Sequence, residues 1–578
     1  MIKNAHRTFT KSSWRRIFCS LFLVAGAVAL VAALASSDAV GQRVGGNAVN
    51  IANKIAPWVV QHTAYGQQAE FFVVLADRAD LSAAAELPTK TEKGRFVYQT
   101  LSEKAQRTQR PILQWLRDRN IEHQSFYIVN AILVKGTRQI ADTLAARPDV
   151  ARVEGNPRIQ NNLPQPEAAN ESPGTSDARP AAIEPGVAYT HAPDVWGLGF
   201  TGEGIVVASA DTGVRWTHNA LKPHYRGWDG TNADHDYNWH DSIHDSVGNV
   251  CGNDSPFPCD DQAHGTHTTG TMVGDDGAGN QIGMAPGAKW IGCRNMDANV
   301  GTPARYIECM QWFLAPTRIG GGDPDPTKAP DITNNSWECP PSEGCSFDTL
   351  QAAVEAQAAA GIMMLSAAQN SGPGCSTVQN PPGIYEATYS AGALNTGTDT
   401  IASFSSRGPV TADGSNRIKP DITAPGTGTR SSTNASDSSY ANFSGTSMAT
   451  PHIAGAMALL WNAIPSLRHQ LTASRDALNS SSVHISSTQC GDPGPPNNVY
   501  GWGRVDIFAA VGGGPTPTPT ATATATATPT ATATPTATTT PPPSPSPTPT
   551  STVRPTPTPR GTPPFRPRPT PHPRPSPP

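Results

Sequence analysis

The 578-residue chain has no excess of either charge. Its 42 lysines and arginines nearly balance 46 acidic residues, and charged residues make up only 15% of the sequence. This balance predicts no nucleic-acid partner, because binding to a polyanion requires a strongly basic surface. At this length the chain exceeds one ordinary domain, so we expect two folded units with unfolded ends.

Beyond residue 34 the sequence has no apolar run long enough to cross a membrane, which predicts no membrane span in the mature form. An apolar run over residues 17–34 follows a basic region and ends in a small-residue cleavage site at residues 33–35. We interpret residues 1–35 as a signal peptide and expect a secreted or cell-surface protein. An uncleaved membrane anchor is the alternative. Arg15-Arg16 leaves the twin-arginine route open beside the general secretory route, which we favour.

The sequence has no Cys-x-x-Cys pair, which argues against a zinc site. Cys19 lies in the predicted signal, and the remaining even number of cysteines favours disulfides in an exported chain. The pairs Cys251–Cys259 and Cys339–Cys345 are the natural candidates for short loops, although the spacing alone leaves the connectivity open. The other four cysteines are Cys293, Cys309, Cys375 and Cys490.

Residues 69–160 alternate strand-like and helix-like apolar patterns. We predict strands over 70–75, 125–135 (as one strand or two) and 150–153, and helices over 97–119 and 137–146. This order predicts a small α/β domain of the split βαβ type. Residues 161–185 are rich in Pro, Asn, Glu and Ser, which predicts an exposed linker of the kind that proteases cut.

Residues 186–511 predict a second, larger domain. Short apolar strands are expected over 204–210, 331–336 and 362–367, and helices over 351–360 and 453–463. Strands that are apolar throughout favour an α/β fold with a doubly wound, mainly parallel sheet covered by helices on both faces. Residues 513–578 are Thr-Pro and Thr-Ala repeats, which predict a disordered tail. A spacer, a glycosylated stalk and a plain tail all remain open.

Three short segments carry residues suited to nucleophilic catalysis: Asp211 in Ser-Ala-Asp-Thr-Gly, His264 in His-Gly-Thr-His, and Ser447 in Ser-Gly-Thr-Ser-Met-Ala-Thr-Pro. Each alone has a plain explanation, as a turn former, a polar surface or a helix cap. Together, in the order Asp, His, Ser, they resemble the subtilisin-like serine proteases. The resemblance covers residues 185–511 and extends to further segments. These are Asn334-Asn-Ser-Trp, which most resembles the bacillopeptidase F branch, Phe404-Ser-Ser-Arg-Gly-Pro and Lys419-Pro-Asp-Ile-Thr-Ala-Pro-Gly.

The resemblance implies a serine endopeptidase that acts on proteins or peptides and requires no cofactor for its chemistry. His264 would take the proton of Ser447, and Asp211 would orient His264. The apolar stretch 449–460 predicts a helix with Pro451 in its first turn, so that the helix N-terminus faces the developing oxyanion. Asn370 occupies the place of the second oxyanion donor.

The expected substrate-binding residues depart from the family pattern. The family usually has Gly where Gln369 precedes Asn370, next to the specificity pocket. The resemblance places Gln379 near the pocket floor, and Ser336 and Trp337 along the substrate channel.

The resemblance also makes residues 69–160 an inhibitory propeptide that self-cleavage, somewhere in 156–185, would release. Family members commonly bind calcium. The Asp- and Asn-rich insert 229–261 could hold a structural calcium ion or be a solvated acidic loop, so the metal ligands stay unknown.

Other enzyme classes fit less well. Gly197-x-Gly199-x-x-Gly202 matches a dinucleotide fingerprint but precedes its strand, and His264 with His267 lacks the His-Glu-x-x-His motif of zinc hydrolases. The Gly-x-Ser-x-Gly motif of α/β-hydrolases is missing around Ser447. A catalytically silent binding protein with the protease fold is the alternative from another class, and the presence of all four catalytic residues argues against it.

Overall fold

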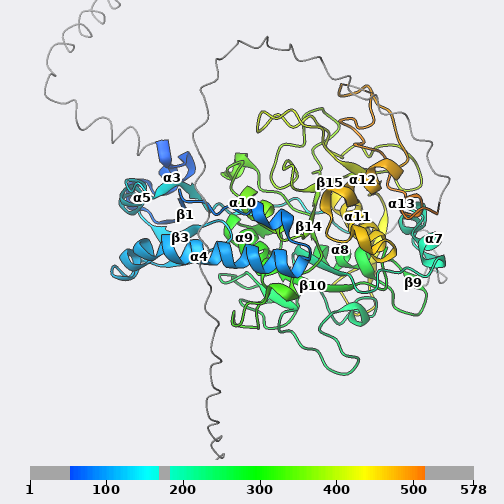
Figure 1. Ribbon diagram of the computed structural model, residues 1–578, viewed down its shortest axis with the longest axis horizontal. Coiled ribbons are helices and arrows are strands. Elements are labelled where there is room, and N and C mark those ends of the chain that lie inside the picture. The colour runs from blue at the N-terminus through cyan, green and yellow to red at the C-terminus, as the bar shows by residue number, and fades with distance from the viewer. Residues whose placement is uncertain (1–52, 168–181, 492, 514–578) are drawn as a thin grey trace, which may run out of the picture. The chain divides into compact units, whose positions relative to one another are not determined.

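The computed structural model describes residues 53–167, 182–491 and 493–513 (Figure 1). The predicted signal peptide and all but the first residue of the predicted tail lie outside this range. Among the described residues, no helix has both the length and the apolar character that a membrane span needs.

The N-terminal subdomain, residues 53–160, has the predicted strand-helix-strand-strand-helix-strand order. Its four strands form an antiparallel sheet in the order β2-β3-β1-β4. The elements are β1 (Ala69–Leu75), α4 (Lys90–Arg117), β2 (His123–Phe126), β3 (Ala131–Gly136), α5 (Arg138–Ala145) and β4 (Val150–Gly155).

Helix α4 begins seven residues earlier than predicted. Thr89 and Glu92 form a capping box, in which each side chain binds the backbone N–H of the other residue. A short helix, α3 (Pro57–His62), precedes the predicted range. It contacts β4, and the ring of Trp58 lies so close to Gly155 that a Cβ there would be 2.5 Å from it. The subdomain therefore begins before residue 69.

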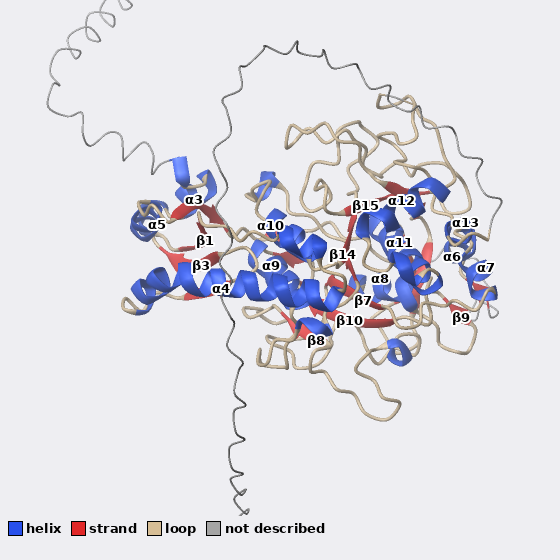
Figure 2. Cartoon of the chain, viewed as in Figure 1, coloured by secondary structure: helices blue, strands red, loops and turns tan. Residues whose placement is uncertain are grey.

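The large subdomain, residues 186–511, is built on a seven-stranded sheet (Figure 2). The strand order is β16-β15-β14-β13-β7-β10-β8, and every neighbouring pair is parallel. The doubly wound α/β prediction is confirmed. The strands are β7 (Val206–Asp211), β8 (Trp239–Asp241), β10 (Lys289–Arg294), β13 (Ile332–Asn335), β14 (Met363–Ala367), β15 (Tyr389–Leu394) and β16 (Ile422–Pro425).

Helices cover both faces of this sheet. Helices α8 (His264–Val273) and α11 (Thr446–Ala463) pack on one face, and α9 (Pro303–Leu314) and α10 (Gln351–Ala359) on the other. Strand β14 illustrates the arrangement, because Met363 and Leu365 belong to the core beneath α11 whereas Met364 belongs to the core beneath α9 and α10. A strand buried on both faces has no polar side, which is why its sequence is apolar throughout.

Shorter elements complete the chain. The remaining helices are α6 (Pro185–Tyr189), α7 (Ala192–Gly197), α12 (Leu471–Ser481) and α13 (Ile507–Ala510). Three small sheets combine β5 (Ile159–Gln160) with β12 (Val300–Gly301) and β11 (Met296–Asp297), β6 (Ala182–Ile183) with β9 (Asn280–Gln281), and β17 (Thr429–Ser432) with β18 (Tyr440–Phe443). Single 3₁₀ turns lie at 64–66, 82–86, 222–224, 326–328, 341–343 and 465–467.

Four disulfides link the eight cysteines that follow the predicted signal. Cys251–Cys259 and Cys339–Cys345 are the short loops expected from the spacing. The other two bonds join Cys293 to Cys309, between β10 and α9, and Cys375 to Cys490 across 115 residues. Only the fold brings the last pair together.

The two subdomains share a core and polar contacts. Phe126 and Ile128 belong to the same buried cluster as Ile307 and Met310 of α9. Lys90, at the start of α4, forms an ion pair of 3.1 Å with Asp331. The division of the chain at residues 161–185 stays a prediction, since the described parts on either side pack as one body.

Candidate active site

Asp211 and His264 form a fully buried hydrogen-bonded pair. Nδ1 of His264 lies 2.8 Å from Oδ1 of Asp211, and neither side chain is exposed to solvent. Asp211 ends β7, and its carboxylate also accepts the N–H of Thr212 at 2.8 Å. A buried carboxylate on Nδ1 fixes the tautomer in which Nε2 is the free acceptor. Nε2 of His264 has no hydrogen-bond partner among the described residues.

A close approach of α8 to the end of β7 makes this pair possible. A Cβ at Gly265 would lie 2.1 Å from the carbonyl oxygen of Gly213, so only glycine fits. Ala263, just before the helix, has φ 84°, a left-handed conformation that turns the chain into α8 at His264. This close contact explains why glycine follows His264 in the sequence.

Ser447 is the second residue of α11, so it lies in the first turn as expected. Pro451 does not: it is the sixth residue of the helix, so the prediction of a first-turn proline is wrong. Because Pro451 has no N–H, the carbonyl of Ser447, four residues earlier, lacks its usual helical hydrogen-bond donor. The Ser336 hydroxyl instead donates to that carbonyl at 3.4 Å, and Oγ of Ser447 lies 3.5 Å from the Ser336 carbonyl. Helices α8 and α11 pack against each other.

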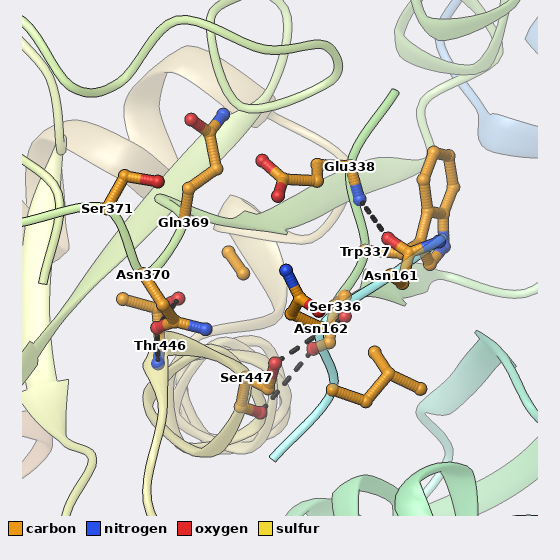
Figure 3. Close-up of a pocket in the computed structure, with 12 residues that line it drawn as sticks. Asn161, Asn162, Ser336, Trp337, Glu338, Gln369, Asn370, Ser371, Thr446 and Ser447 are labelled. Atoms are coloured by element: carbon orange, nitrogen blue, oxygen red, sulfur yellow. Dashed lines mark hydrogen bonds between the residues drawn. The ribbon is translucent and has the colours of Figure 1, made fainter. Parts of the chain in front are cut away.

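Asn370 is held beside this helix N-terminus. Its Oδ1 accepts both the backbone N–H and the hydroxyl of Thr446, each at 2.9 Å. Because the oxygen is occupied, the side-chain NH₂ group is left to donate into the cavity that Asn370 and Ser447 line together (Figure 3).

This cavity has a volume of about 90 Å³ and contains three of the four predicted substrate-binding residues. Ser336, Trp337 and Gln369 line it, and the Trp337 indole N–H donates to the Ala210 carbonyl at 3.0 Å. The full lining is Asn161, Asn162, Leu163, Ser336, Trp337, Glu338, Ala367, Gln369, Asn370, Ser371, Thr446 and Ser447.

Gln379 is not among the residues that line this cavity, and its place near the pocket floor stays a prediction. Its side chain donates to the Ser376 carbonyl at 2.9 Å, and its backbone N–H donates to Oε1 of Gln369 at 3.2 Å. The Gln369 side chain, which lines the cavity, donates to the Asn380 carbonyl at 2.7 Å. Gln379 therefore contacts a lining residue of the cavity.

A segment of the predicted linker lies in the cavity, within the range 156–185 where the resemblance implies self-cleavage. Strand β5 pairs with β12, and Asn161 then donates its N–H to the Asn299 carbonyl at 2.9 Å. Leu163 follows in the lining, Pro164 packs against Gly445, and Glu167 donates its N–H to the Asn442 carbonyl at 2.8 Å. The chain therefore crosses the cavity in an extended form.

The second histidine of the His-Gly-Thr-His motif has a structural role. His267 is fully buried, and burial lowers its pKa to about 3. Its Nε2 lies 3.0 Å from the Thr429 carbonyl, and its ring stacks on Phe443. A neutral His267 that donates a hydrogen bond to a backbone carbonyl accounts for the second histidine of the motif.

Acidic residues of the insert 229–261 bind protein groups. Asp241 and Asp261 form ion pairs of 2.9 and 3.1 Å with the buried guanidinium of Arg294. Asp260 accepts the hydroxyl of Thr212 at 2.9 Å, next to Asp211. Within the described ranges, no group of three His, Cys, Asp or Glu side chains is arranged to hold a metal ion. The calcium hypothesis stays a prediction.

Comparison with known proteins agrees with this geometry. The sequence model of the subtilase family matches residues 202–503, just over half of the chain. The chain belongs to the subtilase family. The match spans the buried Asp-His pair, Asn370 and Ser447.

The chain is also similar to several named proteases. The chain is 34% identical over 499 residues to bacillopeptidase F of Bacillus subtilis, covering 80% of this chain and 33% of that protein. It is 33% identical over 310 residues to serine protease AprX of B. subtilis, covering 50% of this chain and 64% of that protein. Subtilisin E of the same organism is 25% identical over 328 residues, covering 56% and 70%. The chain spans only about a third of bacillopeptidase F.

Proposed function

We propose that this subtilase is a secreted serine endopeptidase made as a self-processing zymogen, with Asp211, His264 and Ser447 as its triad and Asn370 in its oxyanion hole. The observation that carries the proposal is the buried hydrogen bond of 2.8 Å between Asp211 and His264. A fully desolvated carboxylate on Nδ1 stabilises the imidazolium that forms when Nε2 takes a proton.

The proposed reaction uses these groups in turn. Nε2 of His264 takes the proton of Ser447 Oγ, which attacks the peptide carbonyl. The oxyanion forms at the N-terminus of α11 beside the backbone N–H of Ser447, and the Asn370 NH₂ group donates from the other side. His264 then gives its proton to the leaving amine, and water releases the acyl group by the same steps. The Ser447–Ser336 contact of 3.5 Å is weak and gives way to the histidine as substrate binds.

The crossing segment supports the zymogen hypothesis. Residues 161–163 line the cavity beside Ser447, with backbone pairing upstream to Asn299 and downstream to Asn442. An extended peptide held on both sides of the nucleophile has the geometry of a substrate. We place self-cleavage within residues 161–164, after which the crossing segment leaves the cavity and the N-terminal subdomain is released.

Export is the remaining part of the proposal. It depends on the signal at residues 1–35, outside the described residues, and on the disulfides, which form in oxidising compartments.

The test compares the wild-type precursor with Ser447→Ala and with the exposed-serine control Ser480→Ala, using intact mass, N-terminal sequencing and casein hydrolysis. We expect wild type and control to shorten, to begin within residues 162–164 and to digest casein, whereas Ser447→Ala stays full length and inert. If all three stay uncut and inactive, the protein is a silent binding protein of this fold.

A further inference from the structure

The cavity beside Ser447 contains one carboxylate without a cationic partner. Glu338 lines the cavity, and its side chain and that of Asn162 reach into it (Figure 3). The Asn380 side-chain NH₂ group donates to Oε2 of Glu338 at 2.8 Å. Among the described residues no Lys, Arg or His forms an ion pair with this carboxylate, and the charged neighbour that acts on it is Glu343, of the same sign. The field in the cavity is therefore negative.

The position of Glu338 is fixed from both sides. The next residue, Cys339, is buried, forms a disulfide with Cys345 and donates its N–H to the Pro381 carbonyl at 2.8 Å. Asn380 precedes Pro381, so the segment that carries Glu338 is joined to the Asn380–Pro381 segment by a backbone and a side-chain hydrogen bond. A preorganised carboxylate loses little conformational entropy when it binds a charged group.

No other lining residue is charged. The rest of the wall consists of neutral groups, which include the Gln369 amide and Ala367. A partly buried carboxylate with one neutral donor is poorly compensated, and burial raises the pKa of Glu338. An arriving cation would restore the interactions that the carboxylate loses with water.

We propose that Glu338 makes this protein select peptides with Arg or Lys on the acyl side of the cleaved bond. The inference rests on the proposed function, because it assigns the cavity to the residue whose carbonyl Ser447 attacks. We assign that place to Asn162, which lines the cavity together with Glu338 and whose neutral side chain provides no counter-charge for the carboxylate. A guanidinium or ammonium group there would pair with Glu338, while Gln369 and Asn380 stay in place.

The test uses processed enzyme and four peptide substrates that differ only at this residue, as Arg, Lys, Gln or Leu. We expect kcat/KM for Arg and Lys to exceed that for Gln and Leu by about 10-fold or more. Glu338→Gln, which keeps the shape and the Asn380 contact, should lower the Arg and Lys values about 10- to 100-fold and leave Leu within about 3-fold. Glu355→Gln on α10 removes the same charge outside the cavity and should change none of them.

A preference of the wild type for Leu or Gln would overturn the inference, and so would an equal loss on all four substrates in Glu338→Gln. Binding gives a readout that does not need chemistry. In the processed enzyme, calorimetry should show that cationic benzamidine binds about 10-fold or more tightly than neutral benzamide, and Glu338→Gln should abolish the difference. Equal binding of the two probes refutes the role of Glu338, whereas inactivity of the wild type with a preserved difference refutes only the proposed catalysis.

Discussion

Gln124 of the N-terminal subdomain donates a hydrogen bond of 2.9 Å to Glu308 on α9 of the large subdomain. Glu308 also accepts from His240 at 2.8 Å and from His244 at 3.1 Å. Burial alone would raise the pKa of Glu308, but the two histidines hold it well below its ordinary value. The hydrogen bond to Glu308 in turn raises the pKa of His244 to about 9. The junction between subdomains thus contains a titrating pair.

The stability of the precursor should depend on pH through this pair. Because the folded pKa of His244 lies above its ordinary 6.5, its contribution is complete below that pH and is lost as the pH rises through about 9. The contribution of Glu308 is complete above its ordinary 4.5 and is lost as the pH falls further. We expect the melting temperature of the Ser447→Ala precursor to fall between pH 7 and pH 10.

His244→Gln is the matched control, since glutamine can donate to Glu308 but does not titrate in this range. Its melting temperature should fall less steeply over the same pH interval. The same slope in both proteins would mean that other groups cause the loss.

Removal of the Asn370 donor should lower turnover more than substrate binding. Asn370→Ala is expected to reduce kcat about 10²–10³-fold with little change in KM, the range for removing one such donor from subtilisin. Asn370→Asp keeps the acceptor for Thr446 but has no NH₂ group, so it should lose at least as much activity. Steady-state kinetics on one peptide substrate measure both effects. If Asn370→Asp retained wild-type kcat, the side chain would act only by positioning Thr446.

Much of the fold follows from local patterns, because alternation and helical periodicity are visible in each segment. Strand β14 was predicted over 362–367 and spans Met363–Ala367, and α10 was predicted over 351–360 and spans Gln351–Ala359. The start of α4 was missed because the weakly apolar first turn depends on its capping box, and not on an apolar stripe. Local signals predict elements better than they predict their ends.

The candidate site also contains residues that local motifs predict and residues that only the fold brings together. Asp211, His264, Asn370 and Ser447 lie in short motifs, so their residues could be proposed without coordinates. Glu338 could not, because a single acid after a buried tryptophan looks like surface until the fold brings Asn380, 42 residues away, to its side chain. The exact path of residues 161–163 through the cavity could not be predicted, since the resemblance implied only a cleavage somewhere in 156–185.

The long disulfide should stabilise the protein more than a short one. Cys375 and Cys490 are 115 residues apart in sequence, whereas Cys251 and Cys259 are 8 apart. In the chain-entropy model, closing the longer loop contributes about 4–5 kcal/mol and the shorter about 2–3 kcal/mol. We expect the corresponding double serine variants of Ser447→Ala to lose about those free energies of unfolding, measured by guanidinium titration. Equal losses would show that the entropy of the unfolded chain does not depend on the loop length as this model requires.

Gln369 combines an unfavourable backbone with favourable side-chain contacts. Its φ of 78° lies in the left-handed region, which costs a residue other than glycine about 1 kcal/mol or more. The side chain offsets this strain through its hydrogen bonds to the Asn380 carbonyl and the Gln379 N–H, which contribute about 1 kcal/mol each.

Replacement of Gln369 by glycine and by alanine separates the two contributions. Gln369→Ala loses the hydrogen bonds and keeps the strained backbone, so its free energy of unfolding should fall by about 2 kcal/mol. Gln369→Gly loses the same bonds and relieves the strain, so it should be about 1 kcal/mol more stable than the alanine variant. Guanidinium unfolding in the Ser447→Ala background measures both. Glycine normally weakens a folded position relative to alanine, so a glycine variant less stable than alanine would show that the backbone at Gln369 is not strained.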